Sequence, residues 1–102
     1  MARGGRKLSR EGFALQALAR QDSRPTRVGF TATRKLGNAV VRNRTRRRLR
    51  EAARLVLGER PLVGFDIVLI GRPATPTLPF ARLRAEFADA LDRLAEQRRP
   101  PG

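Results

Sequence analysis

The chain has 102 residues, 40% of them hydrophobic, and its 23 Lys and Arg residues against nine Asp and Glu residues give a net charge of +14. This length fits one small domain spanning residues 1–102, and a charge so far from neutrality predicts a polyanionic partner. Nucleic acid is the first candidate, an acidic membrane surface the second and acidic proteins the third. No apolar run is long enough for a membrane span or a signal peptide, so we expect a cytoplasmic protein without a membrane partner.

The composition leaves the polypeptide poorly equipped for covalent chemistry. It contains no Cys and no His, so thiolate chemistry is excluded, and the commonest transition-metal ligand and general base are missing. The nine acidic residues are scattered along the chain, and no pair has the spacing of a hydrolytic dyad or a divalent-metal site. We therefore expect neither catalytic residues nor a metal site in the protein itself.

The first third of the chain predicts short strands. Residues 1–10 form a basic arm or a short edge strand, and residues 12–19 alternate in a pattern that favours a strand over a helix. A clearer strand covers residues 26–33, with Val28 and Phe30 on one face. The simplest pairing for this strand is a hairpin with 12–19.

A long basic helix follows the connection 34–38. Asn38 is expected to cap it, because its side-chain oxygen can accept a backbone N–H of the first turn, and the helix should end near Gly58. On a helical wheel the apolar arc holds Val41, Thr45, Leu49, Ala52, Leu55 and Val56. The polar arc holds Arg42, Asn43, Arg46, Arg47, Arg50 and Arg54. One face can pack on a core while the other binds a polyanion.

The last third predicts a strand, a loop and a second helix. Residues 65–70 are almost wholly apolar, which indicates a central or doubly covered strand. Asp66 within it is expected to face an Arg side chain or a backbone amide. Three prolines make 71–79 an extended loop, and 80–98 carries an apolar stripe at helical spacing, before a frayed tail. The order of these elements predicts an α+β two-layer sandwich, a small mixed sheet with helices packed on it.

Nucleic acid fits the polar arc of the basic helix better than a merely solvated charged face does. Arg dominates over Lys, which suits bidentate phosphate contacts and stacking on bases, and the positive end of the helix dipole adds to the field. Glu51 has the spacing to pair with Arg47 or Arg54. One glutamate cannot neutralise the cations around it, so nucleic-acid binding is the first interpretation.

The residue order within this stretch is specific. Residues 35–44, KLGNAVVRNR, resemble the signature of the bacterial ribonuclease P protein subunit, including its Arg-Asn-Arg core. The resemblance extends to RVGFTAT at 27–33 and GFDIVLIGR at 64–72, and covers about nine-tenths of the chain. It implies a fold like domain 2 of ribosomal protein S5, with a left-handed β-α-β crossover through the basic helix, against the usual right-handed rule.

The resemblance also implies a function and a division of labour. An RNA partner carries the active site of an endoribonuclease and removes the 5′ leader from precursor tRNA. The magnesium ions that this reaction needs are expected to be bound mainly by that RNA, and the protein is expected to join the complex as a monomer.

Matching positions imply which residues contact RNA. The implied RNA-binding residues are Arg34, Lys35, Asn38, Arg42, Asn43, Arg44, Arg46, Arg47 and Arg50. The candidate leader contacts are Phe13, Gln16, Thr31 and Thr33. Asn43 is neutral, so we expect it to act through a specific hydrogen bond, for instance to the loop before the helix.

The sequence departs from the family pattern at its start. Family members normally carry a helix ahead of the first strand, whereas here residues 6–9 match the first strand and 12–16 the second. In the family this helix and the sheet form a cleft that guides the single-stranded leader. We therefore expect the N-terminal helix, and with it half of that cleft, to be missing.

Two other functions stay open at this point. The first is a ribosomal or nucleoid structural protein that binds nucleic acid by shape and charge. The second is a protein-only nuclease, which the lack of His and of clustered acids disfavours.

Overall fold

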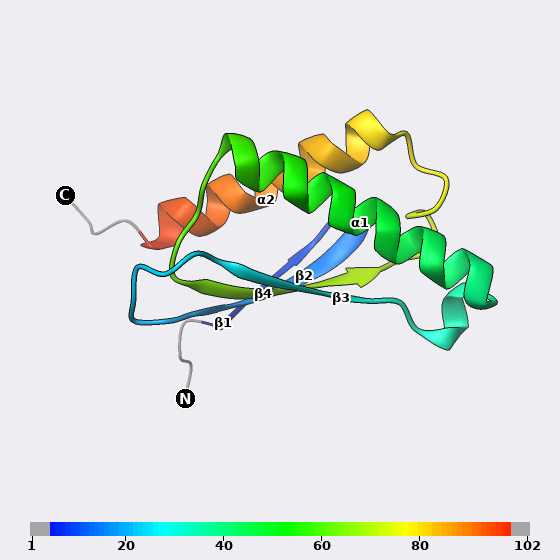
Figure 1. Cartoon of the computed structure of the whole chain (residues 1–102), viewed down its shortest axis with the longest axis horizontal. Helices are drawn as coiled ribbons and strands as arrows, with labels where there is room; N and C mark the ends of the chain where they lie inside the picture. Colours follow the sequence, from blue (N-terminus) through cyan, green and yellow to red (C-terminus); the bar gives the residue numbers. More distant parts are fainter. Residues whose placement is uncertain (1–4, 99–102) are drawn as a thin grey trace.

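Two helices cover one face of a four-stranded sheet, and none of the helices between residues 5 and 98 covers the other face, called the open face below (Figure 1). The structure is a computed structural model that describes residues 5–98. The strands are β1 (Gly5–Ser9), β2 (Phe13–Ala19), β3 (Arg27–Thr31) and β4 (Phe65–Gly71). The helices are the short 3₁₀ turn η1 (Arg34–Leu36), α1 (Ala39–Glu59) and α2 (Phe80–Arg98). The α+β two-layer sandwich is confirmed, and within residues 5–98 neither long helix is apolar enough to span a membrane.

The strand order β1-β2-β4-β3 corrects the predicted pairing of β3. We expected a hairpin between 12–19 and 26–33, but β2 pairs antiparallel with β1 and β4, and β3 pairs parallel with β4. The physical reason is the apolar content of β4. The register places Ile67 between Ala17 and Val28, so the most hydrophobic strand lies inside the sheet rather than at its edge.

The unit β3-α1-β4 makes the crossover that the resemblance implies. In Figure 1 the helices lie above the sheet, β3 and β4 both point to the right, and β3 lies in front of β4. Viewed from the helix side with the strands pointing up, the second strand therefore lies to the left of the first. This is a left-handed connection, opposite to the common one.

The core lies between the sheet and the two helices. Alternate residues of the central strands face the helices, and those that are buried are Phe13, Leu15, Ala17, Phe65, Ile67 and Leu69. The predicted apolar arc of α1 is buried at Thr45, Leu49, Ala52 and Val56, while Val41 and Leu55 are half-buried. Helix α1 continues through Gly58, which does not take the left-handed conformation we expected for a helix end, and stops at Glu59.

Two expectations concern the ends of the chain. The basic arm forms strand β1 from Gly5 to Ser9, which also agrees with the match of 6–9 to the first family strand. The expected absence of an N-terminal helix and the frayed tail fall mostly on residues 1–4 and 99–102, outside the described residues.

Helix α1 approaches the end of β4 closely at Gly71. A Cβ atom at Gly71 would lie 2.4 Å from Cγ2 of the buried Thr45 and 3.1 Å from Cδ1 of Leu36. Real Cβ atoms essentially never lie as close as 2.4 Å to another heavy atom, so Thr45 or the backbone would have to shift for any larger residue at this position. The contact fixes how far the start of α1 stands from the sheet.

We predict that Gly71→Ala destabilises the fold by about 1–3 kcal/mol, because the added methyl group overpacks this contact. Urea unfolding followed by far-UV circular dichroism measures the change, since the chain has no Trp or Tyr. Gly29→Ala is the matched control: a Cβ on this β3 residue meets nothing within 4 Å. Equal stability of the two variants would contradict the proposed close approach.

Candidate nucleic-acid interface

Gly37 and Asn38 set the start of helix α1 and the direction of its first turn. Gly37 has a φ of 143°, a value that side chains rarely tolerate. The Oδ1 atom of Asn38 accepts the backbone N–H of Val41 at 3.0 Å, which confirms the predicted cap. The Asn38 oxygen is therefore committed to the helix, and its amide N–H groups are what it can offer to RNA.

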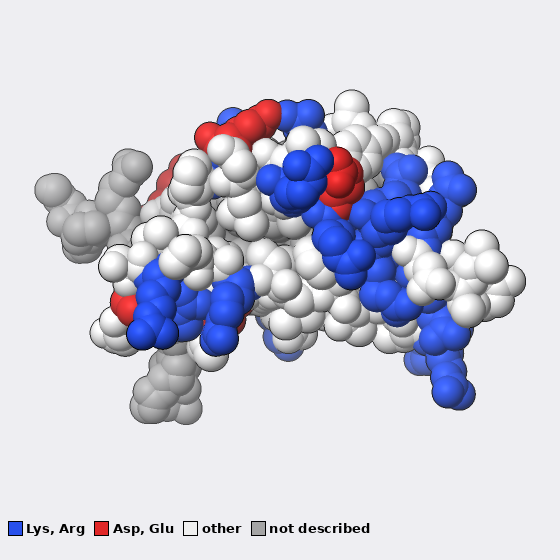
Figure 2. All heavy atoms as spheres, viewed as in Figure 1, with Lys and Arg blue, Asp and Glu red and all other residues white. Residues whose placement is uncertain are grey.

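Cationic side chains gather over the N-terminal half of α1 and the η1 turn before it (Figure 2). We define the basic face by the residues Arg34, Lys35, Arg42, Arg46, Arg47 and Arg50. Arg34, Lys35 and Arg47 are exposed, and within residues 5–98 no hydrogen bond or ion pair holds their side chains. Glu51 pairs with Arg54 at 2.5 Å rather than with Arg47. The charge of Arg47 is thus left free for a ligand.

Two further members of the basic face, Arg50 and Arg42, lie against the body of the protein. The guanidinium of Arg50 lies 5.5 Å from the centre of the Phe30 ring, a cation–π contact that ties it to β3. Arg42 is half-buried, and its Nε is a buried donor without a partner in the described structure. Such unsatisfied groups cost free energy and are often found where a ligand binds.

Asn43 does make a side-chain hydrogen bond, but not to the loop before the helix. Its Oδ1 accepts from Nη2 of Arg46 at 2.6 Å, so the expected partner was wrong. The bond joins two side chains one helical turn apart. It orients the Arg46 guanidinium along the exposed surface of α1, within the basic face.

Arg44 and Arg48 turn away from the basic face toward the loop 72–78. Arg44 Nε donates to the carbonyl of Pro76 at 3.1 Å. Arg48 donates to the carbonyl of Leu78 and lies over the ring of Phe80 at 5.9 Å. Burial, and then the nearby charge of Arg44, lower the pKa of Arg48. Arg44 stays exposed, so it retains N–H groups for RNA, whereas Arg48 joins α1 to the loop.

The candidate leader contacts divide between the two faces of the sheet. Phe13 was predicted to touch the leader, and this is wrong: its side chain is 0% exposed and packs edge-to-face on Phe87, with ring centres 6.0 Å apart. Alternation along β2 explains the error, because Phe13 faces the helices while Gln16 faces the open side. Thr31 and Thr33 are exposed at and beyond the end of β3.

The open face of the sheet has a shallow hollow of about 620 Å³ around Gln16. In the strand register Gln16 lies between Lys7 and Val68. Leu18 and Val68 are 47% and 39% exposed there, and both line the hollow together with Lys7. An apolar floor with an amide and a cation at its side suits an unpaired base and its backbone.

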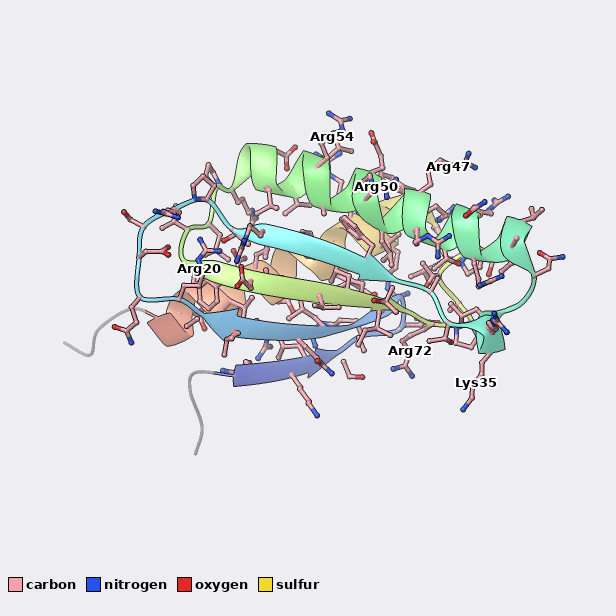
Figure 3. The ribbon with its side chains drawn as sticks, turned by 60° about the horizontal axis from the view of Figure 1, so that its bottom comes forward. Arg20, Lys35, Arg47, Arg50, Arg54 and Arg72 are labelled. Atoms are coloured by element: carbon pink, nitrogen blue, oxygen red, sulfur yellow. The ribbon has the colours of Figure 1, made fainter. Side chains whose placement is uncertain are left out.

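The sheet end at the start of β4 is held by a network of charged side chains around Arg20 (Figure 3). Arg20 pairs with Asp66 at 2.7 Å and with Asp22 at 3.1 Å, and also donates to carbonyls of residues 24, 25 and 65. Arg27 pairs with Asp66 at 2.9 Å. The expectation that Asp66 faces an Arg is confirmed. The central place of Arg20 had no signal in the sequence, because its partners come from separate segments.

We predict a pH dependence from this network. Hydrogen bonds from Arg27, and then from Arg20, lower the pKa of Asp66 in the folded state. A lowered pKa stabilises the fold above the unfolded-state value of about 3.9, and this contribution is lost as the pH falls through the folded pKa. Wild type should therefore exceed Asp66→Asn in stability at pH 7, and the difference should shrink between about pH 5 and pH 2.

Urea unfolding of both proteins at several pH values measures this difference. Glu96→Gln is the control for net charge, because Glu96 is exposed on α2 and forms no ion pair within residues 5–98. A difference between wild type and Asp66→Asn that stays constant with pH would refute the role of the Asp66 charge.

A cationic helix face beside an open sheet face with an apolar hollow defines a nucleic-acid-binding protein of the α+β class. Comparison with known proteins makes this specific. The family model for ribonuclease P matches residues 1–95. The ribonuclease P protein component of Gluconacetobacter diazotrophicus is 61% identical over 91 residues, which span 89% of this chain and 78% of that protein. The corresponding protein of Symbiobacterium thermophilum is 47% identical over 89 residues, 87% of this chain and 76% of the relative.

Solved structures agree with these relatives. The RNase P protein from Thermotoga maritima superposes with a TM-score of 0.73 at 31% identity, covering 87% of this chain and 83% of that one. A mutant RNase P protein from Staphylococcus aureus superposes with a TM-score of 0.72 at 23% identity, covering 89% and 75%, and supports the fold alone. The chain belongs to the ribonuclease P protein family, protein components of an endoribonuclease that acts in tRNA processing. This membership decides against the ribosomal or nucleoid alternative.

Proposed function

We propose that this protein binds the catalytic RNA of ribonuclease P through the basic face of α1, and that it helps this RNA to remove the 5′ leader from precursor tRNA. The observation that supports the proposal most is the set of unpaired cations Arg34, Lys35 and Arg47, which lie within and beside the motif that the family shares. Arg binds phosphate in a bidentate manner, so a cluster of this kind suits a folded RNA backbone.

The division of labour places the chemistry on the RNA. The proposed interface has no free carboxylate for Mg²⁺, since its neighbour Glu51 is paired with Arg54. The side-chain oxygens of Asn38 and Asn43 already accept hydrogen bonds within the protein. The magnesium ions would therefore be bound by RNA phosphates, and the protein would contribute by neutralising charge and positioning the two RNAs. We place this complex in the cytoplasm, with one copy of the protein.

The open face of the sheet is the proposed site for the leader. Gln16 lies in the hollow, Thr31 is the last residue of β3, and Thr33 lies just beyond it, on the path to the basic face. Their hydroxyl and amide groups can bind a flexible strand without selecting one sequence, as suits leaders that differ among precursor tRNAs.

Reconstitution tests the whole function. The protein mixed with its cognate RNA should support magnesium-dependent cleavage of precursor tRNA at moderate salt, and the protein alone should cleave nothing. Cleavage by RNA-free protein would overturn the proposed division of labour.

A second prediction concerns the basic face itself. Arg47→Ala should weaken binding to the catalytic RNA, and the slope of log affinity against log salt should fall by about 0.9, the value for one lost phosphate contact on a duplex. Arg93→Ala is the control, since it also removes one exposed cation, from α2, where Arg93 lies beside Asp89. Filter binding at several salt concentrations measures both. An unchanged slope for Arg47→Ala would show that this side chain does not contact RNA.

A further inference from the structure

The guanidinium of Arg50 has an aromatic partner on another element of the fold. Its Cζ atom lies 5.5 Å from the centre of the Phe30 ring, which belongs to β3. Phe30 is opposite the buried Leu69 in the strand register, so its side chain lies on the face of the sheet that the helices cover. Strand β3 is an edge strand, and Phe30 packs against the core there while staying half-buried. Arg50 itself is exposed.

Three arginines follow one another at intervals of one turn along α1, and each is held by a different kind of partner. Arg46 donates to Oδ1 of Asn43 at 2.6 Å, and Arg54 pairs with the carboxylate of Glu51 at 2.5 Å. The Arg50 guanidinium has the ring, and no hydrogen bond or ion pair holds it within the described part of the chain. Arg50 and Arg54 are both labelled on α1 in Figure 3. Of the three, only Arg54 has its charge neutralised by its partner.

An aromatic ring orients a guanidinium without using its hydrogen-bond donors. The ring attracts the positive charge as a whole, so no N–H group has to be given to an acceptor. A guanidinium carries five N–H donors, and a carboxylate partner would occupy two of them in a bidentate pair and cancel the charge. Arg50 is therefore held in place while its charge and its donors stay available to an anion.

Order before binding is what makes such a contact matter for affinity. An Arg side chain loses conformational entropy when it is immobilised in an interface, and a contact already made in the free protein reduces that loss. We propose that Phe30 is a positioning residue for the RNA interface. Its ring holds the Arg50 guanidinium in the orientation in which this group binds a phosphate of the catalytic RNA, and Phe30 acts through Arg50 alone. The proposal rests on the function proposed above.

The test measures binding of the catalytic RNA by variants of the full chain, with filter binding at several salt concentrations. Phe30→Leu keeps an apolar side chain but removes the ring, and should weaken binding by about two- to fivefold, the range of an exposed cation–π contact. The salt slope should stay unchanged, because no cation is lost. Phe30→Tyr keeps a ring and should bind like wild type.

A double-mutant cycle separates this role from a merely structural one. Arg50→Ala should weaken binding and lower the salt slope by about 0.9. If Phe30 acts through Arg50, adding Phe30→Leu to Arg50→Ala should cause no further loss of affinity. An equal effect of Phe30→Leu in both backgrounds would refute the positioning role. Wild-type affinity of Phe30→Leu, or equal losses for Phe30→Leu and Phe30→Tyr, would refute it as well.

Val28→Ala is the matched control for the packing of β3. Val28 is also half-buried, lies on the same face of the same strand and packs against the core. Its replacement should leave the RNA affinity unchanged, and a loss as large as that of Phe30→Leu would show that packing of the strand is the cause.

Far-UV circular dichroism checks that each variant is folded. If Phe30→Leu is not, Phe30→Met makes the same comparison with a more adaptable apolar side chain. Proton NMR of the free wild-type protein adds a measurement that needs no folded Phe30 variant. The ring current of Phe30 should shift the side-chain signals of Arg50 away from those of the exposed Arg47, and coincident shifts would overturn the proposal.

Failure of the broader function would look different. If the wild-type protein did not bind the catalytic RNA, the proposed function would fail. If wild type bound and Arg47→Ala behaved as predicted while Phe30→Leu behaved like wild type, only the role of Phe30 would fail.

Discussion

The close contact between α1 and the end of β4 determines the geometry of the basic face. Thr45 packs over Gly71 without room for another methyl group, and its hydroxyl is satisfied inside the helix by the carbonyl of Val41. One side of α1 is thereby fixed against the sheet, so the residues on its other side hold a defined orientation. The same contact brings the loop after β4 within reach of Arg44 and Arg48. The packing of α1 on the core therefore also determines the shape of the basic face.

The large positive charge is not spread evenly, and its distribution separates two uses of arginine. Arg20 and Arg27 pair with Asp66 and so connect separate segments of the chain, whereas Arg54 pairs with Glu51 within α1. Arg34 and Arg47 face solvent within reach of a large anion. Because the chain has few acidic residues, its ion pairs are concentrated at sheet ends and helix contacts. The surface around the start of α1 therefore keeps its positive electrostatic potential. Exposed ion pairs contribute little to stability, so leaving these cations unpaired costs the fold little stability.

Local sequence patterns predicted the helices and strands well, whereas contacts between segments distant in the sequence were harder to predict. Asn38 caps α1 as expected, and the wheel identified its buried face, because both depend on neighbours within a few residues. The pairing of β3 was wrong because it depends on the later strand β4, which competes for the same edge. Phe13 was assigned to the wrong side: alternation separates two faces but does not tell which one the helices cover. The contact of Arg44 with the loop 72–78 was not predicted, because that loop has no periodic pattern from which its position could be inferred.

Strand β1 forms one edge of the sheet, and an edge strand presents unpaired N–H and C=O groups to which another chain can add. This strand is only five residues long and carries Arg6 and Lys7. A second copy that approached with the same strand would bring like charges together across a short interface. The positive charge that suits the protein to a polyanion therefore also disfavours edge-to-edge pairing of β1 between two copies.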